Sequence, residues 1–387
     1  MAVREIIEGI YEVGAIHWDR TVFDELVHIP DGTSYNSYLI KDEKTVLIDT
    51  VDPEKKDVLF ENLEILGIDR IDYIISNHAE QDHSGSIPFV LEKYPEAKVI
   101  TNPKCKDFLI DLLHIPEDKF IEVSDGEEFK IGKKTLKFIY TPWVHWPETM
   151  TTYLIEDKIL FSGDFFGSHR AASHLFVKDE YKVIEDAKRY YAEIMMPFRT
   201  QIQNNLKKLE NLEIRYIAPT HGPVYNNPEI IINAYKEWVS PKCSNKVLIP
   251  YVSMHGSTKV MVDYVVDRLT EAGIEVIPIN LTKMDIGVLT MNLIDATTIV
   301  FASPYVLAGY HPAIVYAVYL VNALRPKTRF IGIMGSYGWG GKGPDQLKSM
   351  LYALNVEYLK TVMIKGLPRE DDFRLLDELV EEIKKRH

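Results

Sequence analysis

The sequence predicts an α/β protein of two domains: a sandwich of sheets with outer helices, then a doubly wound parallel sheet of five strands. Residues 1 to about 240 contain many short strand-like runs between turn clusters, so strands outnumber helices there. Beyond residues 240–246, apolar strands alternate with helical segments, as in a doubly wound fold. The length of 387 residues agrees with two domains of ordinary size.

In the first half, strands are predicted from short apolar runs that turn residues bound on both sides. Apolar residues at helical spacing, Val58, Leu59, Leu63 and Leu66, predict one of the outer helices. The predicted strands are Thr45–Ile48, Tyr73–Ser76, Lys98–Thr101, Leu136–Tyr140, Thr152–Ile155 and Ile159–Ser162.

In the second half, the last helix is predicted over residues 371–385, where five apolar residues share one face. Because the alternating pattern starts at Lys246, we place the domains at residues 1–243 and 246–387. The predicted strands are Lys246–Tyr251, Glu275–Ile279, Thr297–Phe301, Arg329–Met334 and about 358–363.

Composition excludes several classes of protein. A net charge of −13 argues against a nucleic-acid partner. No run approaches the roughly 20 apolar residues of a membrane span, and the N-terminus does not resemble a signal peptide, so we expect a cytoplasmic protein without a membrane partner. Cys105 and Cys243 are far apart and outside any CxxC pair. Any metal must therefore be held by His, Asp and Glu.

Four ligand-type residues follow the predicted strand that ends at Ser76, in the pattern H-x-E-x-D-H. In an extended or looping backbone, His78, Glu80 and Asp82 can share one side. His83 then comes from the adjacent turn, and Gly85 permits a sharp bend. The alternative is a solvated polar loop. The density of ligand types favours a metal site.

Three further ligand-type residues each follow a strand-like run, beside Gly or Pro: His145, Asp164 and His221. Taken singly, each such residue is more often structural. Together with the first four, they supply four imidazoles and three carboxylates. That set is sufficient for two metals with one bridging carboxylate.

These motifs resemble the metallo-β-lactamase superfamily, whose hydrolases carry HxHxDH and hold zinc. The resemblance implies an αββα sandwich for the first domain. Here Glu80 replaces the second imidazole, which hardens the site and favours iron. H-x-E-x-D-H followed by His145-Trp146-Pro147 resembles the flavodiiron proteins in particular.

Three loops at predicted strand ends of the second domain predict a ligand site, since such loops meet at one edge of a doubly wound sheet. Hydroxyls and backbone N–H groups at a helix N-terminus suit a phosphate, and aromatic residues suit a flat ring. No GxGxxG and no Walker pattern is present. The alternative is that these residues merely close turns. The loop residues are Ser253, Met254, His255, Gly256, Ser257 and Thr258, then Ser303, Pro304 and Tyr305, then Gly335, Ser336, Tyr337, Gly338, Trp339 and Gly340.

The first loop is similar to the flavodoxin phosphate loop, and GSYGWGG at 335–341 is close to the flavodiiron form of the third loop. The resemblance therefore spans nearly the whole chain and implies FMN in a flavodoxin-like domain. It also implies two irons, each imidazole ligand hydrogen-bonded through its other nitrogen, and Tyr190 or Tyr191 near the open substrate side. By the resemblance, one iron is bound by His78, Glu80 and His145, the other by Asp82, His83 and His221, and Asp164 bridges them.

The resemblance implies that electrons pass from the flavin to the irons, which reduce dioxygen to water, nitric oxide to nitrous oxide, or both. A reduced flavin and a diferrous pair hold four electrons, which is what one dioxygen requires. We expect an external donor, either rubredoxin or a reduced deazaflavin coenzyme, rather than a nicotinamide cofactor. The family also implies a head-to-tail homodimer, or a dimer of dimers, with Trp146 lining the contact between one subunit's flavin and the other's irons.

Three positions depart from the family pattern. His255 stands where the family often has Trp, and Val306-Leu307-Ala308 where it often has Asn. Asp24-Glu25 stand where many members have a His that hydrogen-bonds around the metal site without binding the metal. Two other functions remain open: a metal hydrolase with an accessory flavodoxin-like domain, and an electron carrier with a degenerate metal site. Glu80 favours the reductase over the hydrolase, and the complete ligand set argues against the carrier.

Overall fold

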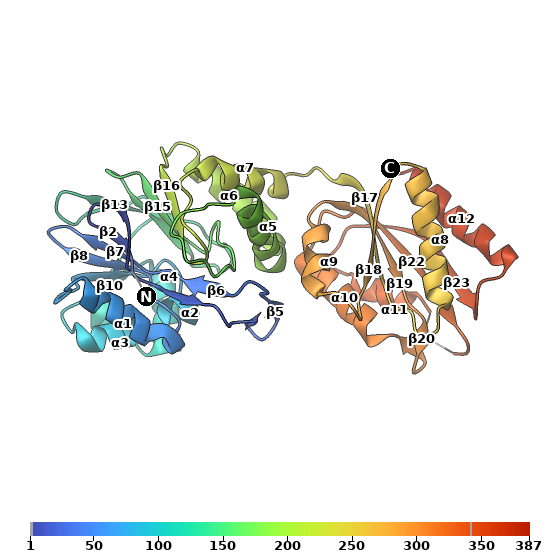
Figure 1. The fold of residues 1–387 in the computed structure, drawn as a ribbon, viewed down its shortest axis with the longest axis horizontal. Coiled ribbons are helices and arrows are strands. Elements are labelled where there is room, and N and C mark those ends of the chain that lie inside the picture. The colour runs from blue at the N-terminus through green and yellow to red at the C-terminus, as the bar shows by residue number, and fades with distance from the viewer. Residues whose placement is uncertain (1–2, 341–342) are drawn as a thin grey trace. The chain divides into compact units, whose positions relative to one another are not determined.

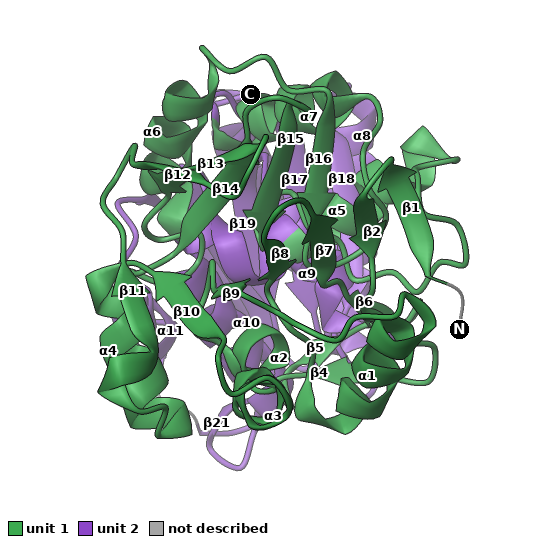
Figure 2. Ribbon diagram, turned by 90° about the vertical axis from the view of Figure 1, so that its left-hand side faces the viewer, with its two compact units in different colours: residues 1–190, 198–239 green, residues 191–197, 240–387 purple. Residues whose placement is uncertain are grey.

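The computed structural model describes residues 3–340 and 343–387, which pack as two compact units (Figure 2). Gly341, the last residue of the GSYGWGG motif, lies outside the described residues. Unit 1 comprises the chain up to Tyr190 together with Phe198–Val239, and unit 2 comprises Tyr191–Pro197 and Ser240–His387. Within the described residues, no helix combines the length and the apolar character that crossing a membrane requires.

Unit 1 is a sandwich of two sheets, as predicted. Within the described residues, the first sheet has the order β1-β2-β7-β8-β9-β10-β11 and the second has the order β12-β13-β14-β15-β16. The strands of the first sheet are Arg4–Ile7, Ile10–Glu12, Tyr38–Lys41, Thr45–Ile48, Tyr73–Ile75, Lys98–Thr101 and Phe120–Glu122. Those of the second are Glu128–Lys130, Thr135–Tyr140, Met150–Leu154, Ile159–Gly163 and Tyr216–Pro219.

The core of unit 1 lies between the two sheets. Ile40, Ile48 and Ile75 of the first sheet share a buried cluster with Phe138 and Phe161 of the second. Helices α1 and α3 lie on the outer side of the first sheet, and α6 and α7 lie beside the second, which confirms the αββα architecture (Figure 1). The helices are α1 (Lys56–Ile65), α2 (Gln81–Ser84), α3 (Ile87–Lys93), α4 (Pro103–Leu113), α5 (Glu180–Tyr190), α6 (Arg199–Leu209) and α7 (Pro228–Val239). Two small hairpin-like pairs complete the unit, β3 (Ala15–His17) with β6 (Thr33–Tyr35) and β4 (Val22–Phe23) with β5 (Val27–His28).

The ends of β9, β15 and β16 position the ligand-type residues. Strand β9 pairs in parallel with β8 and β10, and β15 pairs in parallel with β16, so these ends carry open loops rather than tight hairpins. Asn77 links the two sheets at this edge: its carbonyl accepts from Met150 N at 3.0 Å, and its Oδ1 accepts from the Thr152 hydroxyl at 2.7 Å.

Unit 2 is a five-stranded parallel sheet in the order β18-β17-β19-β22-β23, the doubly wound arrangement that the sequence predicts. Helices α8 and α12 cover one face of the sheet, and α9 and α10 cover the other (Figure 1). Its strands are Ser244–Tyr251, Glu275–Asn280, Ala296–Ala302, Phe330–Tyr337 and Glu357–Lys365, numbered β17, β18, β19, β22 and β23. Its helices are α8 (Ser257–Glu271), α9 (Ile286–Leu293), α10 (Pro312–Leu324), α11 (Asp345–Met350) and α12 (Glu370–Lys384).

One element of unit 2 was not predicted. The second loop folds into a small hairpin of β20 (Tyr305–Val306) and β21 (Gly309–Tyr310). Its two turn residues, Leu307 and Ala308, adopt φ values of 51° and 60°. Hairpin turns with two positive φ values favour Asn and Gly, so Leu-Ala gives no sequence signal for this turn.

Candidate metal centre and flavin site

The segment after β9 does not run as one extended or looping stretch. Glu80 is extended, with φ −61° and ψ 140°, but the next four residues form the single helical turn α2. The turn separates Asp82 and His83 from His78 and Glu80, so the expectation that His78, Glu80 and Asp82 share one side is wrong.

The expected reason for Gly85 is also wrong. Its φ of −61° is open to any residue. A side chain is excluded instead by space, because a Cβ atom here lies 2.7 Å from Cγ of Pro53.

The first cluster contains His78, Glu80, His145 and Asp164. The imidazole Nε2 atoms of His78 and His145 lie 3.1 and 3.2 Å from Oε2 of Glu80. Nε2 of His145 is also 3.3 Å from Oδ2 of Asp164. Atoms bound to one metal at about 2.0–2.2 Å lie roughly 3–3.5 Å apart, so this spacing suits a shared cation.

The second cluster contains Asp82, His83 and His221, all buried. Oδ2 of Asp82 lies 3.1 Å from Nε2 of both His83 and His221. Both oxygens of Asp82 and both ring nitrogens of His83 are buried without a hydrogen-bond partner among the described residues. Such atoms cost about 1–3 kcal/mol each when unsatisfied. A metal ion fits this cluster because it would satisfy the Asp82 carboxylate and Nε2 of His83.

Asp164 lies between the two clusters with one oxygen toward each. Its Oδ2 faces the first cluster, 3.3 Å from His145 Nε2 and 3.5 Å from His78 Nε2. Its Oδ1 faces the second, 2.9 Å from His83 Nε2 and 3.7 Å from His221 Nε2. Thr220 fixes the carboxylate by donating to Oδ1 at 2.9 Å. This geometry suits a bridging ligand.

The donor set suits iron at both positions. Each cluster has two imidazoles and one carboxylate of its own, in addition to Asp164. Two His and one carboxylate form the ligand set of many non-haem iron sites, whereas zinc hydrolases of this fold are richer in imidazole.

Electrostatics at the centre also favours bound cations. Burial raises the pKa of the Asp164 carboxyl, but His83 and a hydrogen bond from His145 outweigh it and hold that pKa well below its usual value. Burial raises the pKa of Asp82 to about 8. The negative charges of Glu80 and Asp164 add to this effect, and His83 opposes it. A metal ion competes with that proton, since metal ligands must be deprotonated.

In unit 2, the three predicted loops line a cavity of about 150 Å³. Thr258 and Ser336 join the first and third loops through their hydroxyls at 3.0 Å. Gly256, the residue before α8, makes no side-chain capping bond, and Ser253 accepts from Lys259 N at 3.2 Å, which leaves the N–H groups of Ser257 and Thr258 for an anion. The cavity is lined by Ser253, Met254, His255, Ser257, Thr258, Pro304, Tyr305, Ser336, Tyr337, Gly338 and Gly366.

The remaining expected loop residues lie elsewhere. Ser303 is buried and donates to the Pro304 carbonyl, and Gly335 lies within β22. Trp339 is 72% exposed, and Gly340 adopts a φ of 54° in the third loop. Gly366, which directly follows β23, was not predicted. The cavity lies at the carboxyl edge of the sheet, where doubly wound folds bind their ligands.

Comparison with known proteins agrees with this geometry. The family described as ODP family beta lactamase matches residues 33–222. A nitric oxide reductase of Moorella thermoacetica is 33% identical over 394 residues, which cover 98% of each chain. The rubredoxin oxygen:oxidoreductase of Desulfovibrio gigas has a TM-score of 0.94 at 28% identity, covering 100% of this chain and 99% of the other. The flavodiiron protein of Giardia intestinalis has a TM-score of 0.91 at 29% identity, covering 100% and 97%.

The chain belongs to the flavodiiron proteins.

This flavodiiron protein orients its ligands through residues that the sequence did not reveal. Glu148 is buried, and its Oε1 accepts from His78 Nδ1 at 2.7 Å and from Ala79 N at 3.1 Å. Asp49 holds Asn77 through both carboxylate oxygens at 2.8 Å. His221 Nδ1 donates to the Ser34 carbonyl at 2.6 Å. None of these partners lies in a ligand motif, so only the fold brings them to the metal centre.

The expectation that every imidazole ligand is held through its other nitrogen is wrong for His83. Its Nδ1 is buried and has no hydrogen-bond partner among residues 3–340 and 343–387. His83 is therefore held less firmly than His78 and His221.

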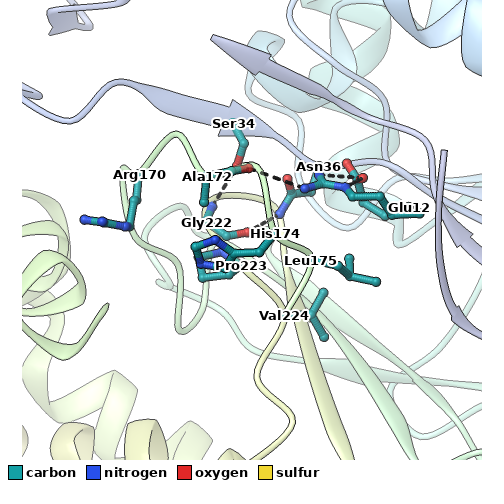
Figure 3. Close-up of a pocket in the computed structure, with 11 residues that line it drawn as sticks. Glu12, Ser34, Asn36, Arg170, Ala172, His174, Leu175, Gly222, Pro223 and Val224 are labelled. Carbon is teal, nitrogen blue, oxygen red and sulfur yellow. Dashed lines mark hydrogen bonds and ion pairs between the residues drawn. The ribbon is translucent and has the colours of Figure 1, made fainter. Parts of the chain in front are cut away.

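The loop that carries His221 is held by hydrogen bonds with Asn36 and Ser34. Asn36 Nδ2 donates to the Pro219 carbonyl at 2.8 Å. It also donates to the Gly222 carbonyl at 2.7 Å, and Gly222 N donates to the Ser34 hydroxyl at 2.8 Å (Figure 3). Gly222 has a φ of 82°, and a Cβ atom here lies 2.2 Å from the Ser168 hydroxyl, so a larger residue does not fit. The adjoining cavity of about 10 Å³ has room for one water molecule.

Replacing Glu148 with glutamine should weaken iron binding in the first cluster by about 10–100-fold. The carboxylate sets the orientation of His78 and strengthens it as a ligand, and a neutral amide does so less well. Iron content after dialysis against graded chelator measures the change. Glu156→Gln, on an exposed hydrogen-bonded position outside the centre, is the matched control. Equal chelator resistance in both variants would rule out this role of Glu148.

Tyr190 lies beside the second cluster, with its ring centroid 5.8 Å from that of His221. Burial and the nearby negative charges of Asp164 and Asp82, with a hydrogen bond to Asp164, raise the pKa of Tyr190 well above its usual value. The phenol therefore keeps its proton. Tyr191, the alternative expected from the sequence, belongs to unit 2.

Asp24 lies in the turn between β4 and β5, where both Asp24 and Glu25 have positive φ values of 50° and 51°. Partial removal of its carboxyl group from water and the charge of Glu80 raise the pKa of Asp24. The charge of Glu80 therefore affects the pKa of Asp24, although Asp24 is not among the clustered ligands.

Replacing Asp24 with alanine should change turnover, or the preference between gases, by no more than about 10–100-fold. Asp24 alters the charge near the ligands but supplies none of the clustered ligand atoms, so both irons should stay. Steady-state rates with dioxygen and with nitric oxide, beside iron content, measure this. Loss of either iron would mean that Asp24 is itself needed for metal binding.

Proposed function

We propose that this flavodiiron protein reduces dioxygen to water, nitric oxide to nitrous oxide, or both, at a diiron centre that receives electrons through FMN. The observation that carries the proposal is Asp164, with one oxygen toward each of two clusters of two imidazoles and a carboxylate. Relatives named nitric oxide reductase and rubredoxin-oxygen oxidoreductase support an oxidoreductase, and the hydrolase alternative is not favoured.

The proposed diiron domain spans residues 1–243, and the proposed FMN domain spans residues 246–387. His78, Glu80 and His145 would hold one iron, Asp82, His83 and His221 would hold the other, and both would share Asp164. The cavity between the three loops of unit 2 would hold FMN, for which the start of α8 offers backbone N–H groups and Tyr305 and Tyr337 offer aromatic rings.

When bound, the two groups supply electron storage and transfer, which no side chain of the centre provides. The protein supplies position and protons. Asp164 sets the distance between the two clusters, and a hydrogen bond from the Thr220 hydroxyl orients its carboxylate. Tyr190 keeps its phenolic proton beside the second cluster and hydrogen-bonds Asp164. Burial of His78, His83 and His221 limits access of water to the centre.

The relatives named rubredoxin-oxygen oxidoreductase and flavorubredoxin support a rubredoxin-type electron donor. A reduced deazaflavin coenzyme is the alternative. We also propose a head-to-tail homodimer, or a dimer of such dimers, in which Trp146 lines the contact between one subunit's flavin and the other's irons. Trp146 packs edge-on against His78, with ring centroids 5.0 Å apart.

We expect NADH alone to reduce the bound flavin slowly. The rate should be at least about 100-fold lower than the rate with reduced rubredoxin from the same cells. The second domain has loops for a mononucleotide and no GxGxxG dinucleotide motif. Stopped-flow absorbance of the flavin under nitrogen measures both rates. Rapid reduction by NADH without a mediator would contradict the proposed donor class.

The proposed function is tested by metal and flavin analysis followed by anaerobic single-turnover mixing. The purified chain should contain about two irons and one FMN. After chemical reduction, it should be reoxidised by dioxygen, by nitric oxide, or by both, with water or nitrous oxide as the product. Zinc as the sole metal, together with no reoxidation by either gas, would overturn the proposal.

A further inference from the structure

His145 is the imidazole of the first cluster that no hydrogen bond orients through its other nitrogen. Nδ1 of His78 is held by Glu148 at 2.7 Å. Nδ1 of His145, in contrast, has no hydrogen-bond partner in the part of the chain that the structure describes, and its Nε2 faces Glu80 at 3.2 Å in the cluster itself. The direction of the His145 ring therefore depends on the backbone of the loop that carries it, residues 141–149.

That loop contains a backbone conformation that is costly for the residue adopting it. Trp143 has a φ of 66°, in the left-handed region. Every residue except Gly meets a steric penalty there, and for a bulky side chain such a φ is a clear outlier. Residues strained in this way persist only where surrounding contacts offset the strain. The contacts of Trp143 therefore decide whether the loop keeps its shape.

The strained residue is tied directly to the turn that contains His145. The Trp143 N–H donates to the Trp146 carbonyl at 2.6 Å, and this bond encloses Val144 and His145. Val144 N donates in turn to the Thr149 hydroxyl at 3.3 Å. Because the φ of Trp143 sets the direction of its N–H relative to the next residues, a change in that angle breaks the bond to Trp146 and moves His145.

Helix α6 braces the loop at two points. The indole ring of Trp143 stacks on the ring of Phe198, with centroids 5.6 Å apart and an angle of 23° between the planes. Since Trp143 is 42% exposed, this stack is a large part of its packing. Asn205 is buried, and its Nδ2 donates to the Pro142 carbonyl at 2.9 Å. Phe198 is the N-cap of α6 and Asn205 lies about two turns further along, so both belong to one face of the helix.

We propose that Trp143 and Phe198 are positioning residues for the metal ligand His145. Their stack holds Trp143 in the left-handed conformation, and that conformation directs the His145 imidazole toward the first cluster. This inference rests on the proposed function, because it takes the first cluster to hold an iron. The two imidazoles of that cluster are then supported differently: His78 by the side chain of Glu148, and His145 by its backbone.

The competing explanation is that the two rings only stabilise the fold. Two substitutions at one position separate the roles, because Trp143→Ala and Trp143→Gly both remove the indole ring. Ala keeps the steric cost of a φ of 66°, whereas Gly adopts this φ freely. Phe198→Ala removes the stack from the other side. Phe129→Ala is the matched control, since it removes a half-buried ring of unit 1 whose centroid is 5.1 Å from that of Tyr73.

The experiment uses the full-length protein with FMN and isotopically enriched iron. Dialysis against graded chelator measures how firmly each iron is held, and Mössbauer spectroscopy records a signal from each. We expect Trp143→Ala and Phe198→Ala to lose one of the two irons at about 10–100-fold lower chelator concentration, with a changed signal from that iron alone. Trp143→Gly and Phe129→Ala should hold both irons within about threefold of the unmodified protein.

Equal iron retention in Trp143→Ala and Trp143→Gly would overturn the inference, because the backbone conformation at residue 143 would then not matter for His145. Loss of both irons to the same degree, or the same loss in Phe129→Ala, would also overturn it, since the effect would be one of general stability. If Phe198→Ala does not fold, the two variants of residue 143 still decide, because both lack the same ring. Failure of the proposed function is distinct, since the unmodified protein itself would then not hold two irons.

Discussion

Replacing Asp164 with alanine should remove at least one of the two irons while leaving FMN in place. The two carboxylate oxygens of Asp164 face different clusters, so its loss leaves two cationic centres without the anion that they share. Removing one partner of a buried charged pair costs about 3–5 kcal/mol, which corresponds to a loss of affinity of roughly 10²–10³-fold or more. Iron and flavin content per chain, with turnover of each gas, measures the effect.

Asp186→Ala is the matched control for this prediction. Asp186 is also a buried carboxylate of unit 1, but it is paired with Arg170 and Lys182 rather than with imidazoles. This variant should keep both irons even if its stability falls. Two irons and full turnover in Asp164→Ala would refute the bridging role, and with it the diiron assignment of the centre.

Replacing Glu80 with histidine should shift metal occupancy from iron toward zinc and abolish gas reduction. Oε2 of Glu80 is close to both imidazoles of the first cluster and supplies that cluster's only carboxylate besides Asp164. An imidazole there restores the nitrogen-rich set that suits zinc and removes a negative charge that stabilises ferric iron. We expect the zinc-to-iron ratio to rise by at least about tenfold in cells given both metals.

Elemental analysis of protein produced with equal supplies of iron and zinc measures this ratio. Glu61→His, on the exposed surface of α1, introduces the same residue away from the centre and should leave the metal ratio unchanged. A Glu80→His variant that still holds two irons and reduces either gas would show that the carboxylate does not select the metal.

The sequence alone predicted the parts of this molecule that depend on local patterns. Strands β8 and β10 match their predicted bounds, and the parallel order of unit 2 follows from its alternating strands and helices. The seven ligand-type residues stand out because they are chemically distinctive and lie at strand ends. What the sequence did not reveal depends on distant contacts.

Glu148 and Asp49 illustrate this limit. Glu148 meets His78 across 70 positions of sequence, and Asp49 meets Asn77 across 28. Neither lies in a repeating pattern, so nothing local distinguishes it from other Glu or Asp residues. The helical turn α2 was missed for another reason: at four residues it is too short for periodicity to appear.

The path of the backbone has a mechanical consequence. The chain passes between the two units at residue 190, at residue 197 and at residue 239, so three covalent tethers join them rather than one linker. Residues Ala192, Met195 and Met196 are buried, and the segment that carries them packs with α9 and α10. Deleting all residues after 243 would remove α9 and α10, and would therefore expose the apolar side chains of Ala192, Met195 and Met196 to water. One of the three crossings comes immediately after Tyr190.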